Sequence, residues 1–117
     1  MDENEAIGGL AALAHAHRLA IFRLLVREGP AGLPAGRIGE ALAIAPSALS
    51  FHLAALDHAG LLRSWRDGRN VFYAVEVAAM RRLLGFLTED CCRGRPELCG
   101  DPAGLDRDEL EKSDARR

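Results

Sequence analysis

Apolar positions near the start of the chain recur at spacings of three, four and seven residues, which is typical of amphipathic helices. This pattern predicts one helix over about residues 5–14 and a second over about residues 15–28. The apolar face of the second helix is predicted at Leu19, Phe22, Leu25 and Val26. A run of glycine, proline and alanine follows at residues 29–32, so we expect the second helix to end there.

Two further helices are predicted on either side of a break that contains a proline. The first covers residues 33–43, with Pro34 in its first turn, where a backbone N–H is not needed. After the break at residues 44–47, the second runs to about residue 59, and Gly60 suits the left-handed residue that ends it. The inward positions of the two helices are predicted at Ile38, Leu42, Leu49, Leu53 and Leu56. A short helix, a tight break and a second helix form a helix-turn-helix unit.

The hydrophobic period then shortens to two, which is the period of a strand. Residues 62–66 and 71–75 alternate and are enriched in β-branched and aromatic types, and Asp67–Asn70 between them contains the Asp-Gly signal of a hairpin turn. A last helix is predicted over about residues 77–89, with apolar residues at Met80, Leu83, Leu84 and Leu87. This order predicts a mainly α fold with a β-hairpin (α+β), the winged helix-turn-helix.

Composition limits the class of protein. Among 117 residues, 49% are hydrophobic and 27% are charged, which fits one soluble globular domain and excludes wholesale disorder. No apolar run approaches the roughly 18 residues of a membrane span, and residues 1–5 are acidic where a signal peptide is basic. We therefore expect a cytoplasmic protein with no membrane partner. The predicted organisation is a DNA-binding and dimerisation domain at 1–90, a cysteine-rich sensing segment at 91–102 and a flexible tail at 103–117.

The charge distribution is more informative than the net charge of -2. Residues 10–85 contain nine arginines and five acidic residues, whereas acidic residues concentrate in the first five positions and after residue 89. A basic centre between acidic ends is consistent with a polyanionic partner. Ordinary scatter of surface charge explains the distribution equally well.

The helix after the proline break has the residue types of a recognition helix. Its N-terminal turns carry small or polar residues that can approach base edges and phosphates, while its leucines face the body of the domain. The hairpin adds two arginines beside its tip, where they suit phosphate or minor-groove contact. The predicted DNA-contacting residues are Ser47, Ala48, Ser50, Phe51, His52, Arg66 and Arg69. Open alternatives are Ser47 as a helix N-cap, His52 as a surface or partly packed histidine with no role, and the wing arginines as solvated charges. We expect Trp65 and Tyr73 to pack the hairpin.

Three segments, residues 14–25, 45–62 and 66–73, resemble the ArsR/SmtB family of metal- and metalloid-responsive repressors. The most specific match is Ser50-Phe51-His52-Leu53 followed by Ala59-Gly60-Leu61, within a resemblance that spans about residues 8–90. The resemblance implies a homodimer built through the first and last helices. It also implies that the inducer-free dimer binds double-stranded operator DNA and releases it when inducer binds. Phe51 departs from the polar or basic residue usual in the family, which can weaken a phosphate contact or shift operator preference.

All three cysteines, Cys91, Cys92 and Cys99, follow the last predicted helix. The six residues before Cys99 include Gly94 and Pro96, which favour a reversal, so the three sulfurs can meet on one ion. A site made only of thiolates selects thiophilic ions, and three sulfurs are one ligand short of a closed zinc site. We therefore expect trivalent arsenic or antimony as inducer, with no organic cofactor. The cysteines also resemble those of the arsenical-sensing branch of the family, in which they lie just after the last helix.

Other functions remain open at this point. A disulfide between Cys92 and Cys99 would make the protein a redox or sulfide sensor, and a winged helix can also serve protein–protein contact. An enzyme is the weakest interpretation, because the four histidines are divided between two predicted helices with no paired carboxylate or phosphate-binding loop. The His15 and His17 pair is interpreted as surface residues rather than as a metal site.

Overall fold

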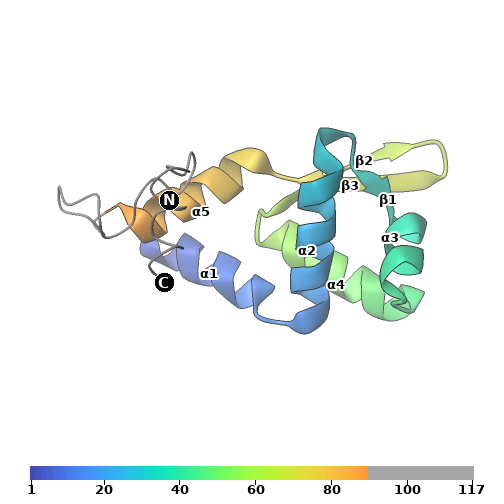
Figure 1. Cartoon of the computed structure of the whole chain (residues 1–117), viewed down its shortest axis with the longest axis horizontal. Helices are drawn as coiled ribbons and strands as arrows, with labels where there is room; N and C mark the ends of the chain where they lie inside the picture. Colours follow the sequence, from blue (N-terminus) through green and yellow to red (C-terminus); the bar gives the residue numbers. More distant parts are fainter. Residues whose placement is uncertain (90–117) are drawn as a thin grey trace, which may run out of the picture. The chain divides into compact units, whose positions relative to one another are not determined.

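The computed structural model describes residues 1–89. The elements follow one another in this order (Figure 1): α1 Glu3–Leu13, α2 Ala16–Glu28, the 3-10 turn η1 Gly29–Ala31, β1 Leu33–Pro34, α3 Ala35–Leu42, α4 Pro46–His58, β2 Leu62–Asp67, β3 Asn70–Val75 and α5 Val77–Thr88. The chain divides into a compact unit at Met1–Leu83 and a second unit that begins at Leu84. The predicted segments 91–102 and 103–117, and with them Cys91, Cys92 and Cys99, lie outside the described residues.

The helix-turn-helix unit has the predicted form. The stripe Leu49, Leu53 and Leu56 of α4 is buried, with no member more than 4% exposed, and Ile38 of α3 is fully buried beside it. The two helices approach closely at Gly39, where an added Cβ would lie 3.2 Å from both the Ile44 carbonyl oxygen and a Leu49 methyl group. The helix-turn-helix is therefore fixed by leucine packing together with a position where a Cβ would be crowded.

The predicted inward face of α2 is partly wrong. Leu25 is fully buried, but Leu19 and Val26 are 46% and 45% exposed. The buried residues of α2 are Ile21, Leu24 and Leu25 instead. Every position of this helix from 19 to 26 except Arg23 is apolar, so the spacing permits more than one apolar stripe. Packing against α1, α3, α4 and β3 selects the stripe that is buried.

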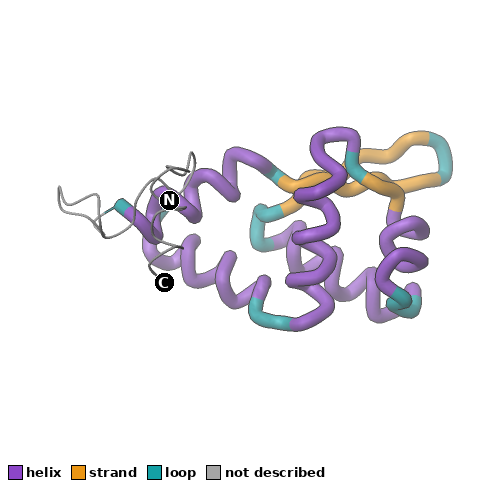
Figure 2. Tube along the Cα trace, in the orientation of Figure 1, coloured by secondary structure: helices purple, strands orange, loops and turns teal. Residues whose placement is uncertain are grey.

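The sheet contains a strand that the sequence pattern did not predict. Leu33 and Pro34 form β1, which pairs antiparallel with β3 through Leu33–Tyr73 and Pro34–Phe72 and gives the strand order β1-β3-β2 (Figure 2). The predicted helix start at residue 33 is therefore wrong: Pro34 is the N-cap and α3 begins at Ala35. A pairing of two residues with partners far along the chain leaves no local periodicity, which explains the error.

The hairpin β2–β3 is confirmed, with each strand one residue longer than predicted. Its register runs from the pair Leu62–Val75 to the pair Asp67–Asn70. Gly68 and Arg69 form the two-residue turn, and Gly68 has φ +66°, which a glycine adopts without strain. The turn therefore has its glycine in the first central position, and the two arginines of the predicted wing contact sit at its tip.

The last helix, α5, also has nearly the predicted bounds. Ala79 and Leu83 are buried in its first part, and Met80 packs partly buried against the core. Leu84 and Leu87, which were expected to belong to the apolar face, are 47% and 50% exposed. Among the described residues, no single helix has the length and apolar character to cross a membrane, and the two consecutive pairs that reach that length together are bent by 101° and 113°.

Candidate DNA-binding face and histidine cluster

The outer face of α4 presents the residues that the sequence assigned to DNA. Ser47, Ser50 and Phe51 are all exposed, and the Phe51 ring is 65% exposed. Ala48 is half-buried beside them. Because the opposite face carries the buried leucine stripe, the helix is held to the body while these side chains point to solvent. This division of one helix into a packed face and an open face is what a recognition helix needs.

The start of α4 settles the alternative interpretation of Ser47. The N-cap is Ala45, which makes no side-chain capping bond, and Pro46 follows at the first helical position. Ser47 is therefore inside the first turn and does not cap the helix. The backbone N–H groups of this turn have no side-chain cap, and such N–H groups favour a phosphate oxygen.

His52 differs from its neighbours on α4. Only 6% of it is exposed, and its Nδ1 accepts a hydrogen bond of 3.1 Å from Arg18 Nε of α2. Burial lowers the pKa of His52 below its usual 6.5, and the nearby charges of His15, Arg18 and His17 lower it further. Because an arginine can only donate, Nδ1 of His52 carries no proton, and His52 is a packed histidine rather than a surface one in the free protein. Its direct contact with DNA stays a prediction.

The sequence contains the signal for this burial. His52 lies three residues after Leu49 and four before Leu56, so helical spacing puts it on the same stripe as the leucines. Its residue type alone predicts a polar, outward side chain. The helical position, rather than the residue type, decides its environment.

Arg18 also supports the exposed aromatic residue of α4. Its guanidinium carbon lies 5.4 Å from the centre of the Phe51 ring, within cation–π range. The same side chain holds His52. Arg18 therefore links the buried and the exposed faces of the recognition helix, a role that the sequence did not indicate.

The wing has a packed base and an open tip. Trp65 stacks on its cross-strand partner Phe72 with ring centres 5.7 Å apart and an angle of 15°, and Tyr73 packs partly buried against the core. The prediction that Trp65 and Tyr73 pack the hairpin is confirmed. Arg66 and Arg69 at the tip are exposed. The wing therefore offers two exposed guanidinium groups on a fixed hairpin.

The structure brings together three of the four histidines. The ring centres of His15 and His17, at the start of α2, lie 4.4 Å and 5.4 Å from that of His52 on α4, and 5.6 Å from each other. One ring nitrogen from each residue lies within 4.8 Å of the corresponding nitrogens of the other two. The sequence identified only the pair on α2, because its spacing is local whereas the contact with α4 is tertiary.

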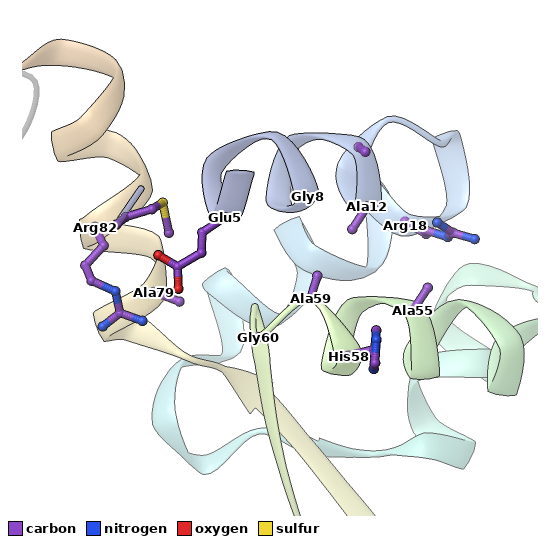
Figure 3. A pocket seen from close by; sticks show the side chains of 12 residues that line it. Glu5, Gly8, Ala12, Arg18, Ala55, His58, Ala59, Gly60, Ala79 and Arg82 are labelled. Atoms are coloured by element: carbon purple, nitrogen blue, oxygen red, sulfur yellow. The ribbon is translucent and has the colours of Figure 1, made fainter. Parts of the chain in front are cut away.

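A hollow of about 640 Å³ opens between α1, α4 and the first part of α5 (Figure 3). Small residues form most of its wall, among them Gly8, Ala12, Ala55 and Ala59. Polar side chains lie around it, with Glu5 and Arg82 on one side of the view and Arg18 and His58 on the other. The sequence does not indicate this hollow, because alanine and glycine on a helix give no chemical signal.

Known proteins are similar to this chain in sequence and in fold. Residues 13–64 match a family model described as a helix-turn-helix domain. The nodulation protein NolR of Rhizobium meliloti is 33% identical over 88 residues, which are 75% of this chain and 70% of NolR. The transcriptional activator HlyU of Vibrio cholerae is 36% identical in an alignment of 89 positions that covers 72% of this chain and 80% of HlyU. The structure of an ArsR-like transcriptional regulator from Rhodococcus sp. RHA1 superposes with a TM-score of 0.67, covering 88% of this chain and 95% of that one, at 24% identity.

A helix-turn-helix with an open recognition face, followed by a wing, defines a winged-helix DNA-binding protein, and the solved structure shows that its fold is of the ArsR type. The identities and coverage of the relatives then show the family. The chain belongs to the helix-turn-helix transcriptional regulators, in one family with NolR and HlyU. It is a DNA-binding regulator of transcription.

Proposed function

We propose that this protein is a homodimeric transcriptional repressor that leaves its operator when trivalent arsenic or antimony binds. The observation that carries the DNA-binding part is the open face of α4, with Ser47, Ser50 and Phe51 outward over a buried leucine stripe. The resemblance to the ArsR/SmtB family supports repression, whereas the relative HlyU is named an activator. A reporter gene behind the protein's own operator tests the direction: deletion of the protein is expected to raise expression.

The recognition helix inserts its first two turns into the major groove. The hydroxyls of Ser47 and Ser50 donate to or accept from base edges or phosphates, and the exposed ring of Phe51 contacts apolar edges such as a thymine methyl group. Arg66 and Arg69 of the wing contact phosphates or the adjacent minor groove. His52 supports this surface from behind through Arg18, which lies over Phe51.

A homodimer is supported by apolar side chains that the described residues leave uncovered. On α1, Ile7 and Leu10 are 54% and 42% exposed at a helical spacing of three. On α5, Val77, Leu84 and Leu87 are 46%, 47% and 50% exposed at spacings of seven and three. Burying such surfaces against a second copy would place two recognition helices for half-sites about 34–36 Å apart. Leu87→Glu is expected to give a monomer by sedimentation, with operator affinity reduced at least tenfold.

The inducer site rests on residue chemistry in the sequence. Cys91, Cys92 and Cys99 supply three soft thiolates, which match the three-coordinate pyramidal geometry of trivalent arsenic or antimony. Because these cysteines follow α5, an ion that binds all three would reshape the end of an element that we assign to the dimer interface. A tenfold loss of operator affinity needs only about 1.4 kcal/mol of coupling free energy.

The test is an arsenite titration of the purified protein bound to its operator, with Cys92→Ser beside the wild type. Arsenite is expected to release wild-type protein and to leave the variant bound, and native mass spectrometry is expected to show one arsenic per chain with three thiol protons lost. Equal release of both proteins would contradict the cysteine assignment. Release by an oxidant and its reversal by a thiol reductant, with no arsenic bound, would identify the disulfide mechanism instead.

A further inference from the structure

The histidine cluster joins two elements that are far apart in the sequence. His15 is the N-cap of α2, His17 lies in its first turn, and His52 is 34 residues beyond Arg18 on α4. Both histidines of α2 are exposed, whereas His52 is buried behind them. The cluster is therefore open on one side to solvent and anchored on the other side in the core.

The ring nitrogens are close enough to converge on one ion. They lie within 4.8 Å of one another, whereas nitrogens bound to one tetrahedral zinc ion at about 2.0–2.1 Å are about 3.4 Å apart. Rotation of the two exposed side chains, His15 and His17, can close the difference between these two nitrogen–nitrogen distances. His52, which has the least freedom, accepts at Nδ1 from Arg18, and because an arginine can only donate, its ring is the neutral imidazole that a metal requires.

We propose that His15, His17 and His52 bind one divalent first-row transition-metal ion, such as Zn²⁺, with water completing its coordination. Imidazole nitrogens suit zinc, copper and nickel, and they do not suit magnesium or calcium, which require oxygen. Three histidines and an open position form a recognised zinc coordination set. The site uses none of the cysteines, so its existence does not depend on the proposed arsenic response.

The metal competes with Arg18 for His52. Nδ1 of His52 accepts the Arg18 hydrogen bond, so in the neutral ring the proton is on Nε2. A metal at Nδ1 displaces Arg18 directly. A metal at Nε2 requires the proton to move to Nδ1, which can then no longer accept. Occupancy by either route breaks the hydrogen bond between Arg18 and His52, and the arginine charge opposes the incoming cation.

This competition connects the site to the recognition helix. Arg18 lies over the exposed ring of Phe51, so a metal that displaces Arg18 from His52 also changes the support of Phe51. In addition, the ion ties the start of α2 to the middle of α4. On the proposed operator-binding function, metal occupancy is expected to change operator affinity by a factor of about 3 to 10, independently of arsenite.

The experiment uses the full chain with Cys91, Cys92 and Cys99 changed to serine, so that thiolates do not bind the probe. Titration with Co²⁺ is expected to give visible ligand-field absorption that saturates at one ion per chain and is displaced by Zn²⁺. His17→Ala, which removes an exposed ring with no side-chain hydrogen bond, is expected to weaken binding at least tenfold. His58→Ala removes the one histidine outside the cluster and is expected to leave affinity unchanged.

Arg18→Gln distinguishes a built site from loose attraction to histidines. It replaces the competing guanidinium and its positive charge with a shorter, neutral amide, so metal affinity is expected to rise about three- to tenfold, whereas for ions bound at scattered histidines it would not change. Equal effects of His17→Ala and His58→Ala, or no Co²⁺ absorption in the cysteine-free protein, would overturn the proposal. Those results would leave the arsenite titration of the wild type unaffected, so the two functions fail separately.

Discussion

The base and the tip of the wing each contain a glycine with the same positive φ, in opposite surroundings. Gly32, at the base, and Gly68, at the tip, both have φ +66°. An added Cβ at Gly32 would collide with the Tyr73 carbonyl oxygen and lie 3.1 Å from the Trp65 ring, whereas nothing lies within 4 Å of one at Gly68. The base therefore sets the direction of the hairpin, and the tip is left free to meet a partner.

The largest expected effect on stability comes from adding a side chain at Gly32, at the base of the wing. Gly32→Ala combines the strain of an alanine at positive φ and extended ψ with a steric clash against the β3 backbone, so we expect a loss of about 3–5 kcal/mol in the free energy of unfolding. Gly68→Ala has the strain alone and is expected to lose about 1–2 kcal/mol. Urea unfolding of both variants measures the difference. Losses of the same size would show that the surroundings of the two glycines do not matter.

The elements that the sequence predicted are those whose cause is local. The hairpin follows from alternation and an Asp-Gly signal, and α4 follows from Pro46, a leucine stripe and Gly60. Strand β1 and the close approach at Gly32 depend on β3, about 40 residues later, so no window of sequence contains them. The fold was therefore predictable in its order of elements but not in the contact that orients the wing.

The candidate site also has features that follow from local sequence and features that depend on tertiary contacts. The open face of α4 is the complement of the leucine stripe, so Ser47, Ser50 and Phe51 followed from periodicity. The burial of His52 also follows from this periodicity, whereas its polar residue type alone predicts an exposed side chain. The meeting of His52 with His15 and Arg18 did not follow, because it depends on how α2 crosses α4.

A smaller effect is expected from substitutions at the wing tip. They are expected to weaken DNA binding rather than to lower stability. The double variant Arg66→Ala and Arg69→Ala removes two exposed cations, so we expect little change in unfolding free energy. If each contacts one phosphate, the slope of log affinity against log salt becomes shallower by about 2, and affinity at about 0.15 M salt falls roughly 10- to 100-fold. Duplex binding at several salt concentrations measures both. An unchanged slope would remove the wing tip from the DNA interface.

The smallest effect on stability and DNA binding is expected for a substitution of Arg63, the arginine of β2 nearest the base of the wing. Arg63 donates a 2.8 Å hydrogen bond to the Pro30 carbonyl oxygen and lies 4.6 Å from the centre of the Trp65 ring, so its charge is engaged within the protein. Arg63→Ala is therefore expected to cost about 1 kcal/mol of unfolding free energy, from one exposed hydrogen bond and one cation–π contact. Its salt slope is expected to match the wild type. Because Arg63 and Arg66 belong to the same strand, a reduced slope for Arg63→Ala would mean that the whole of β2, rather than the tip alone, follows the DNA backbone.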